Sequence, residues 1–265
     1  METQSMTCRS TIHGISGAWW AGGCPRALRV VQVDPESPRV KTLVLDARIE
    51  AQPGQFVMAW LPGYEEKPFS LAESEPVTLT VARVGPFSTA LHALQPGERL
   101  WIRGPLGRGF TIEGRRILLV GGGYGVAPLA FLARVAIEQG IQVTALTAAR
   151  HAEDVLYVDR FRALGAEVVV ATEDGSAGEQ GRATEVAYRL LSAGSYDALY
   201  GCGPEGMLEG LKALAAAFGI PAQLSYEAYM RCGIGLCGSC ERAGVVLCVE
   251  GPVLRFQLSE EGKGG

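Results

Sequence analysis

The chain has 265 residues, of which 48% are hydrophobic and 20% are charged, and its formal net charge is -4. These values are typical of a compact globular protein, and the length suffices for two or three domains. The slightly acidic balance gives no electrostatic reason to expect binding to nucleic acid or to an anionic membrane surface. Residues 1–24 lack the apolar core of a signal peptide, and we expect them to form a loose extension.

Residues 25–114 are predicted to form an antiparallel β-barrel. Five short runs of β-type residues are separated by turn signals, among them three Pro-Gly pairs. The runs span residues 28–33, 40–45, 55–60, 77–84 and 99–103. Regular short strands of this kind favour a barrel.

Two short motifs within the barrel are candidates for contacts with a phosphate or a flavin. Lys67-Pro68-Phe69-Ser70 combines a cation, a rigid turn, an aromatic ring and a hydroxyl. Lys67 can pair with a phosphate there, and Ser70 can hydrogen-bond to a flavin ring nitrogen. The stretch 85–89, which contains Ser88 and Thr89, looks like a second phosphate-facing turn before a short helix. Either motif by itself is also typical of a solvated turn.

Residues 115–222 are predicted to form a doubly wound α/β domain. Strands are expected at 117–120, 141–147, 167–171 and 198–200, and helices at 127–139, 155–164, 184–191 and 206–218. This alternation describes a parallel sheet with helices on both faces. The uncharged stretch 117–133 is slightly short for a membrane span and contains four glycines and a proline, so a strand, a glycine loop and a helix explain it better.

A glycine loop follows the first strand of this domain and opens a helix. Gly121, Gly122, Gly123 and Gly125 would let the backbone approach a pyrophosphate, which the helix N-terminus would bind. The alternative is a tight strand-to-helix turn without a ligand. The strand–loop–helix context favours nucleotide binding.

Two later strand ends are further candidates, because ligands of open α/β sheets bind at the carboxyl ends of strands. Cys202 and Gly203 follow the strand at 198–200, and we expect Cys202 either to face the nucleotide or to be a small buried residue. The stretch 172–175 carries acidic groups that fit a ribose hydroxyl as well as they fit a simple Asp-Gly turn.

Residues 223–265 are predicted to be a cluster-binding segment with a frayed tail. Cys232, Cys237, Cys240 and Cys248 follow the plant-type ferredoxin order, in which four thiolates hold a [2Fe–2S] cluster. Glycines between them suit a backbone that wraps a cluster with positive φ angles. A structural zinc site is the alternative, but zinc sites usually pair their cysteines as C-x2-C. Clustered cysteines indicate a reducing compartment, and we expect a cytoplasmic protein.

The three histidines, His13, His92 and His151, lie outside any nucleophile or metal-binding spacing, and no Ser-His-Asp or paired-carboxylate pattern stands out. We therefore expect bound cofactors to supply the chemistry, while the protein positions them.

These motifs together resemble the ferredoxin reductase superfamily, and more closely the electron-transfer subunits of class 1B dihydroorotate dehydrogenases. The resemblance extends from about residue 26 to residue 258. Its carriers, besides the cysteines, are residues 53–58, 67–71, 104–110, 121–128, 202–204 and 250–252.

The resemblance implies an FAD-binding barrel, an NAD-binding domain and a [2Fe–2S] segment. Electrons would pass between NAD, FAD, the cluster and an FMN-binding dihydroorotate dehydrogenase catalytic subunit, in a heterotetramer that serves pyrimidine (UMP) biosynthesis. By this analogy, residues 67–70, Ser88 and Thr89 contact FAD. The glycine loop, Cys202 and Gly203 line the nicotinamide site, and Ser70 and Cys202 are the candidate catalytic residues.

The sequence departs from the family pattern in two places. Lysine stands at position 67 where the superfamily usually has arginine, which keeps the charge and loses the planar fork. The gap between Cys240 and Cys248 is shorter than in many bacterial members.

An equivalent relay subunit of a sulfhydrogenase, an anaerobic sulfite reductase or a ferredoxin–NADP transhydrogenase is the alternative function. A zinc-stabilised nucleotide-binding sensor is the non-enzymatic one.

Overall fold

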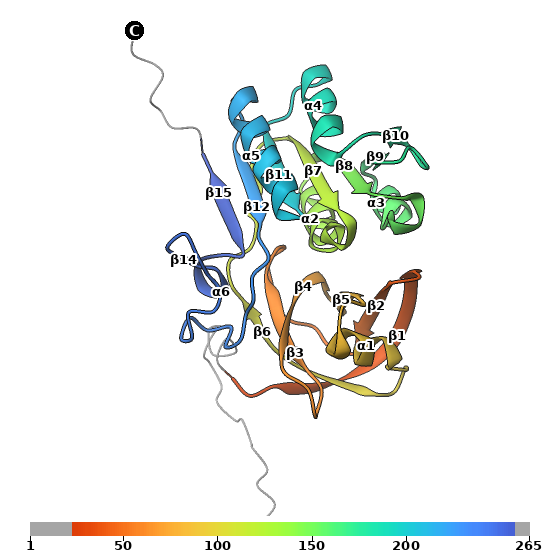
Figure 1. The fold of residues 1–265 in the computed structure, drawn as a ribbon, viewed down its shortest axis with the longest axis vertical. Coiled ribbons are helices and arrows are strands. Elements are labelled where there is room, and N and C mark those ends of the chain that lie inside the picture. The colour runs from red at the N-terminus through yellow and green to blue at the C-terminus, as the bar shows by residue number, and fades with distance from the viewer. Residues whose placement is uncertain (1–22, 258–265) are drawn as a thin grey trace, which may run out of the picture.

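The computed structural model of the protein describes residues 23–257. Figure 1 shows a β-barrel and, beside it, a sheet covered by helices, with a small irregular segment flanking both. The predicted extension, residues 1–24, falls almost entirely outside the described residues. No helix in the described part of the chain is long and apolar enough to cross a membrane.

The predicted antiparallel barrel is confirmed, and six strands close it where five runs were predicted. Their order around the barrel is β1-β2-β5-β4-β3-β6. The strands are β1 (Arg26–Ser37), β2 (Val40–Leu45), β3 (Phe56–Trp60), β4 (Lys67–Ser74), β5 (Val77–Ala82) and β6 (Arg99–Leu106), and helix α1 (Pro86–Ala93) follows β5. Side chains that point inward from these strands are fully buried, among them Val30, Leu43, Leu71, Leu79 and Leu100.

The prediction that residues 67–70 form a turn is wrong, because they begin strand β4. Their partners lie on β3, where Pro68 pairs with Met58 and Ser70 with Phe56. Pairing of β4 with β5 begins only at Leu71. Pro68 therefore needs no N–H for a second ladder, which is the condition under which proline is tolerated in a strand.

The second unit is a seven-stranded sheet, and the predicted doubly wound arrangement is confirmed. The strand order is β10-β9-β8-β7-β11-β12-β15, and all neighbours are parallel except β12 and β15. The strands are β7 (Arg116–Gly122), β8 (Gln142–Ala149), β9 (Glu167–Thr172), β10 (Glu179–Gln180), β11 (Ala198–Cys202), β12 (Ala222–Ser225) and β15 (Val253–Phe256). The helices are α2 (Val126–Glu138), α3 (Val158–Leu164), α4 (Ala183–Ala193) and α5 (Glu205–Phe218), with the 3-10 turns η2 (Gly123–Gly125) and η3 (Ala152–Asp154).

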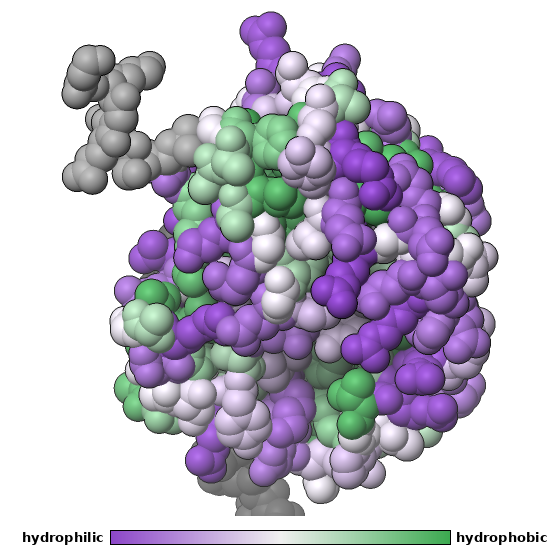
Figure 2. Space-filling model, turned by 45° about the horizontal axis from the view of Figure 1, so that its top comes forward, coloured by the Kyte–Doolittle hydropathy of each residue, from purple (hydrophilic) through white to green (hydrophobic). Residues whose placement is uncertain are grey.

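The central strand β7 separates two hydrophobic cores. Leu118 and Val120 pack with the residues of α4 and α5, whereas Ile117 and Leu119 pack with those of α2 and α3. Successive side chains of a strand point to opposite faces, so an uninterrupted apolar strand is required to fill both cores. The outer surface is mainly hydrophilic on the face drawn in Figure 2, where hydrophobic side chains gather in a few separate groups.

The helix predicted at 155–164 begins later, at Val158, because Tyr157 has a φ of 67° and breaks the right-handed helical path. The Tyr157 side chain is buried against the barrel, where its hydroxyl lies 2.5 Å from the Thr80 hydroxyl. Burial raises the pKa of Tyr157. The contact ties the sheet domain to β5.

Residues 223–265, predicted as a separate segment, also contribute to the sheet. Strand β12 begins at Ala222, and β15 returns to pair with it after an excursion through residues 226–252. We call this excursion the cysteine segment. It holds the short hairpin β13 (Glu241–Arg242) and β14 (Val245–Val246) and the one-turn helix α6 (Leu247–Glu250).

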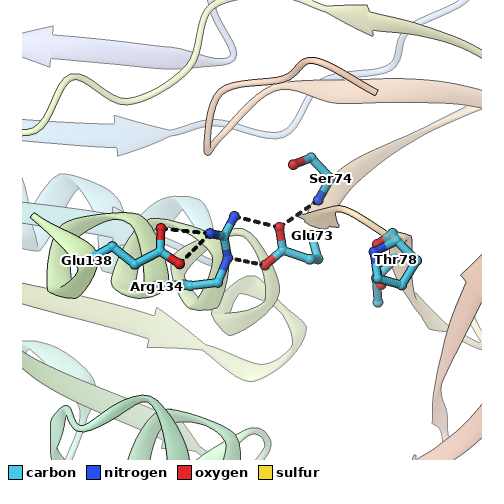
Figure 3. A network of polar contacts seen from close by, with 6 residues as sticks. Glu73, Ser74, Thr78, Arg134 and Glu138 are labelled. Atoms are coloured by element: carbon cyan, nitrogen blue, oxygen red, sulfur yellow. Dashed lines mark hydrogen bonds and ion pairs between the residues drawn. The ribbon is translucent and has the colours of Figure 1, made fainter. Parts of the chain in front are cut away.

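Helix α2 joins the two units. Phe131 of this helix is part of the barrel's hydrophobic core. Arg134, on the same helix, binds the Glu73 carboxylate of β4 through two nitrogens, at 2.6 and 2.8 Å, and also binds Glu138 one turn further along (Figure 3). These contacts hold the barrel against the α2 side of the sheet, and two cavities lie where the units meet.

Candidate functional site

The first cavity, of about 400 Å³, lies between the barrel and the sheet domain. Lys67, Pro68, Phe69, Ser70 and Ser88 line it from the barrel. Across from them, the sheet domain contributes Tyr124, Gly125 and Cys202, and the cysteine segment contributes residues 226–230. The predicted pair Ser70 and Cys202, which are 132 positions apart in the sequence, therefore share one cavity.

Ser88 shapes this cavity through the backbone. Its hydroxyl accepts hydrogen bonds from the amides of Val84 and Gly85, both at 2.9 Å, and donates one to the Gly85 carbonyl. The stretch 85–89 is thus the first turn of α1 itself rather than a turn before it. Thr89 is used in that helical turn, its amide bonding to the Gly85 carbonyl, and it is not among the residues that line the cavity.

Lys67 supplies positive charge at the rim. Its Nζ lies 2.8 Å from a Glu65 carboxylate oxygen and 5.1 Å from the centre of the Tyr229 ring. Glu65 and Tyr229 are both exposed, so the ion pair between Lys67 and Glu65 is weak. The ammonium group of Lys67 can therefore be redirected toward an anionic ligand. The flexible lysine stem suits such a change of partner.

Cys202 is a neutral thiol. It ends strand β11 and is 5% exposed, and this burial raises its pKa to about 12, with the nearby Glu227 carboxylate adding to the effect. Cys202 is therefore small and buried, as one of the two predictions has it, and it also forms part of the wall of the first cavity. Its contact with a nucleotide stays a prediction.

Glu227 is the residue that sequence reasoning missed. It lies two positions beyond the end of β12, beside the strand that carries Cys202, and it lines both cavities. Solvent reaches the carboxylate through these cavities. Its recessed position nevertheless raises its pKa, against the opposing effect of a hydrogen bond from Tyr124. Position at a strand's carboxyl end would have identified Glu227, but the four-residue strand before it was not predicted.

The second cavity, of about 810 Å³, adjoins the first and shares Tyr124 and Glu227 with it. Gly122, Gly123 and Gly203 line it, as expected for a nucleotide site beside the start of α2. Four arginines, Arg39, Arg83, Arg150 and Arg182, also line it. Guanidinium groups at a glycine loop favour a ligand with phosphate groups.

The glycines of the predicted loop have different roles. Gly123 has a φ of 54°, which favours glycine. At Gly125 a Cβ would lie 2.4 Å from the Cys202 carbonyl oxygen, and at Gly121 it would lie 2.4 Å from Val126. Gly121 lines neither cavity. Close packing of the loop on strand β11, rather than ligand contact alone, therefore accounts for part of the glycine run.

Two roles are predicted for the acidic stretch 172–175, contact with a ribose hydroxyl and an Asp-Gly turn, and its two acidic side chains lie in different places. Asp174 accepts hydrogen bonds from the Ser176 hydroxyl and amide and pairs with His151 at 2.9 Å. Ser176, followed by His151, lowers the Asp174 pKa. The neighbouring Glu173 lines the second cavity instead. Asp174 builds a turn, and contact of Glu173 with a ribose hydroxyl stays a prediction.

The four cysteines of the cysteine segment form two pairs. Hydrogen bonds from Ser239 first, and then from Cys232, lower the pKa of the exposed Cys237 to about 6. The buried Cys248 thiol contacts Cys240, and burial raises its pKa to about 12. Two amides point at sulfur, those of Gly235 toward Cys248 (3.2 Å) and of Cys248 toward Cys240 (3.4 Å).

This pairing matches the donor set of a two-iron cluster, in which each iron takes two thiolates. A zinc site needs four ligands around one ion. Gly233, Gly235 and Gly238 have φ angles of 66°, 82° and 69°, which confirms the predicted positive φ angles between the ligands.

The fold and sites define an oxidoreductase with a ferredoxin reductase fold and an iron–sulfur domain. Residues 119–213 match the oxidoreductase NAD-binding domain, and residues 227–258 match the iron–sulfur cluster binding domain of dihydroorotate dehydrogenase B. The solved structure of an NADH-dependent reduced ferredoxin-NADP oxidoreductase is similar, with a TM-score of 0.79 and 29% identity over 88% of this chain and 89% of that one.

Curated relatives narrow the class. The probable dihydroorotate dehydrogenase B (NAD(+)) electron transfer subunit of Methanothermobacter thermautotrophicus is 44% identical over 242 residues, which cover 88% of this chain and 90% of the relative. Its counterpart from Methanocaldococcus jannaschii is 39% identical over 231 residues, covering 86% and 89%. The chain belongs to the family of dihydroorotate dehydrogenase B electron transfer subunits.

Proposed function

We propose that this chain carries electrons between NAD and an FMN-binding dihydroorotate dehydrogenase catalytic subunit, in cytoplasmic pyrimidine biosynthesis. The observation that carries the proposal is that one segment of the chain contributes to both cavities and to the cysteine series. Residues 225–230 line the first cavity, Glu227 also lines the second, and Cys232 follows two positions after Met230. Family membership supports the identity of the partner.

The first cavity is the proposed FAD site. Lys67, Pro68, Phe69 and Ser70 would hold the flavin from the barrel, and the N-terminal turn of α1, fixed by Ser88, would supply amide donors. When bound, FAD exchanges electron pairs with a nicotinamide and single electrons with an iron–sulfur cluster. The second cavity is the proposed NAD site, with Gly122, Gly123 and Gly203 in its wall.

Ser70 and Cys202 stay the proposed catalytic residues. The Ser70 hydroxyl is a hydrogen-bond donor on the barrel side of the cavity, and Cys202 is an uncharged thiol on the other side. An uncharged, small side chain admits a planar ring without introducing a negative charge near a departing hydride. Glu227 and Tyr124 stand where the cavities meet and would orient the nicotinamide.

Cys232, Cys237, Cys240 and Cys248 would hold the [2Fe–2S] cluster. Met230 lines the first cavity and belongs to the same buried group of side chains as Cys240 and Cys248. The cluster site thus shares packed protein with the proposed flavin site, which is the arrangement that single-electron transfer requires.

Anaerobic purification of the full chain tests the relay. We expect bound FAD and an iron–sulfur absorbance that NADH bleaches. Cys240→Ser should lose the cluster and retain NADH-dependent flavin reduction, whereas Cys24→Ser, at an exposed cysteine outside the cysteine segment, should match the parent protein. Protein that contains neither flavin nor acid-labile sulfide would refute the relay.

A second function differs only in the partner. The similarity to a ferredoxin-NADP oxidoreductase structure, at 29% identity, favours an equivalent relay to ferredoxin or NADP. The dihydroorotate dehydrogenase relative has the higher identity, 44%. Mass spectrometry of complexes purified from the native cell decides between them. An FMN-binding dihydroorotate dehydrogenase chain in constant ratio supports the proposal, and a hydrogenase, sirohaem or transhydrogenase subunit contradicts it.

A further inference from the structure

Arg103 is a nearly buried charge between the barrel and the cysteine segment. It lies on strand β6, opposite Met58 of β3, and only 10% of its side chain is exposed. Its Nε and Nη2 both bind the Glu66 carboxylate, at distances from 2.7 to 3.1 Å. Nη2 also donates to the main-chain carbonyl of Cys232 at 2.6 Å. A largely buried arginine side chain therefore holds the first cysteine of the proposed cluster site.

The two residues that Arg103 binds belong to different sites. Glu66 immediately precedes Lys67, the first residue of β4, which carries the proposed flavin contacts. Cys232 begins the cysteine series, and a Cβ at the following Gly233 would lie 3.1 Å from both Met58 and Leu106. Cys232 and Gly233 thus lie against β3 and β6, and Arg103 fixes them there.

We propose that Arg103 is a positioning residue that sets the reduction potential of the cluster. It also fixes the cluster against β4, the strand that carries the proposed flavin contacts. This inference rests on the proposed function. A guanidinium charge shielded from water acts strongly on nearby charge, and it favours the reduced cluster, which carries one more negative charge. Glu66, bound to the same guanidinium, opposes that effect. The balance between the two side chains sets the net field at Cys232.

Substitution of each partner gives shifts of opposite sign. Glu66→Gln leaves the positive charge uncompensated and should raise the midpoint potential. Arg103→Gln leaves the carboxylate and should lower it. In each case we expect at least a tenfold change in the ratio of reduced to oxidised cluster at a fixed potential, which is about 59 mV for a one-electron couple. The double variant should return toward the parent value, because the net charge is restored.

The measurement is a redox titration of the cluster in the full chain, followed by electron paramagnetic resonance. Arg103→Lys keeps the charge and loses the planar fork, so its potential should stay near the parent value while the cluster is lost more readily. Arg189→Gln removes an arginine from another ion pair, with Glu179, at the opposite edge of the sheet, and should leave the potential unchanged.

Midpoint potentials that shift with the same sign in Glu66→Gln and Arg103→Gln, or that shift in neither, would overturn the inference. Disorder around the cluster, without a charge effect, would shift the potential of both variants in the same direction. If Arg103→Gln does not fold, Glu66→Gln and Arg103→Lys decide. A raised potential in Glu66→Gln with a potential near the parent value in Arg103→Lys supports the inference, and an unchanged or lowered potential in Glu66→Gln overturns it. Failure of the proposed function is distinguishable, because the parent protein would then lack a cluster signal altogether.

Discussion

Gly125→Ala tests whether the glycine loop is held by contact with strand β11. Gly125 has an ordinary φ of -62°, so alanine meets no backbone strain there. Its Cβ would, however, lie 2.4 Å from the Cys202 carbonyl oxygen and 2.9 Å from the Gly203 nitrogen. Both are backbone atoms and have no alternative rotamer, so the loop or the strand end must move.

Overpacking of this kind costs about 1–3 kcal/mol. For a chain of this size that corresponds to a fall in Tm of roughly 2–12 °C. The shift also displaces Cys202 and Gly203, which line the two cavities, so we expect slower flavin reduction by NADH in stopped-flow experiments.

Gly206→Ala is the matched control. Gly206 lies in the first turn of α5, and a Cβ there meets no atom within 4 Å. Alanine should stabilise the protein by up to about 1 kcal/mol through helix propensity. The reasoning is refuted if Gly125→Ala unfolds at the parent temperature, or if both variants lose stability equally.

Three further predictions concern contacts between the two units and the carboxylate at the cavities. Arg134→Ala should destabilise the fold by about 1 kcal/mol, because its pair with Glu73 is partly exposed, and denaturant titrations should show a smaller loss at high salt. Tyr157→Phe should cost about 1–2 kcal/mol through the lost hydroxyl contacts with Thr80 and Thr42, whereas Tyr188→Phe, at a side chain 54% exposed, should change the unfolding free energy little. The raised pKa of Glu227 means that the folded state binds its proton more tightly than the unfolded state does. Stability should therefore fall as pH rises from the ordinary carboxyl pKa through the raised value, and Glu227→Gln should remove that fall in unfolding curves measured across pH.

Local signals predicted the order of the elements because each signal acts within a few residues. Pro-Gly pairs mark turns of the barrel, and the apolar run at 117–120 has both faces buried. The same local reading failed at Pro68, which reads as a turn residue in isolation. Only the late start of pairing between β4 and β5, at Leu71, makes a strand possible there.

The parts that the sequence did not predict depend on partners distant in the chain. Tyr157 adopts a positive φ because its ring is buried against β2 and β5, more than 70 residues earlier in the chain. Glu227 lies at the site only because β12 pairs with both β11 and the returning β15. Cysteine spacing identified four candidate ligands, but neither their division into pairs nor the contact of Arg103 with Cys232, 129 residues away, has a local signal.

The position of the cysteine segment between β12 and β15 explains how one short stretch serves three sites. The chain leaves the sheet at Ser225, passes Glu227 where the cavities meet, continues past Met230 in the wall of the first cavity, and reaches Cys232 on the barrel. The order of these residues in the chain is the proposed order of NAD, FAD and cluster. Because both ends of this stretch are held, by the β12 ladder and by Arg103, we expect a shift at one site to displace the next. Changes within residues 226–231 should consequently alter flavin reduction and cluster reduction together, whereas changes at Cys237, which is exposed beyond the Arg103 contact, should affect the cluster alone.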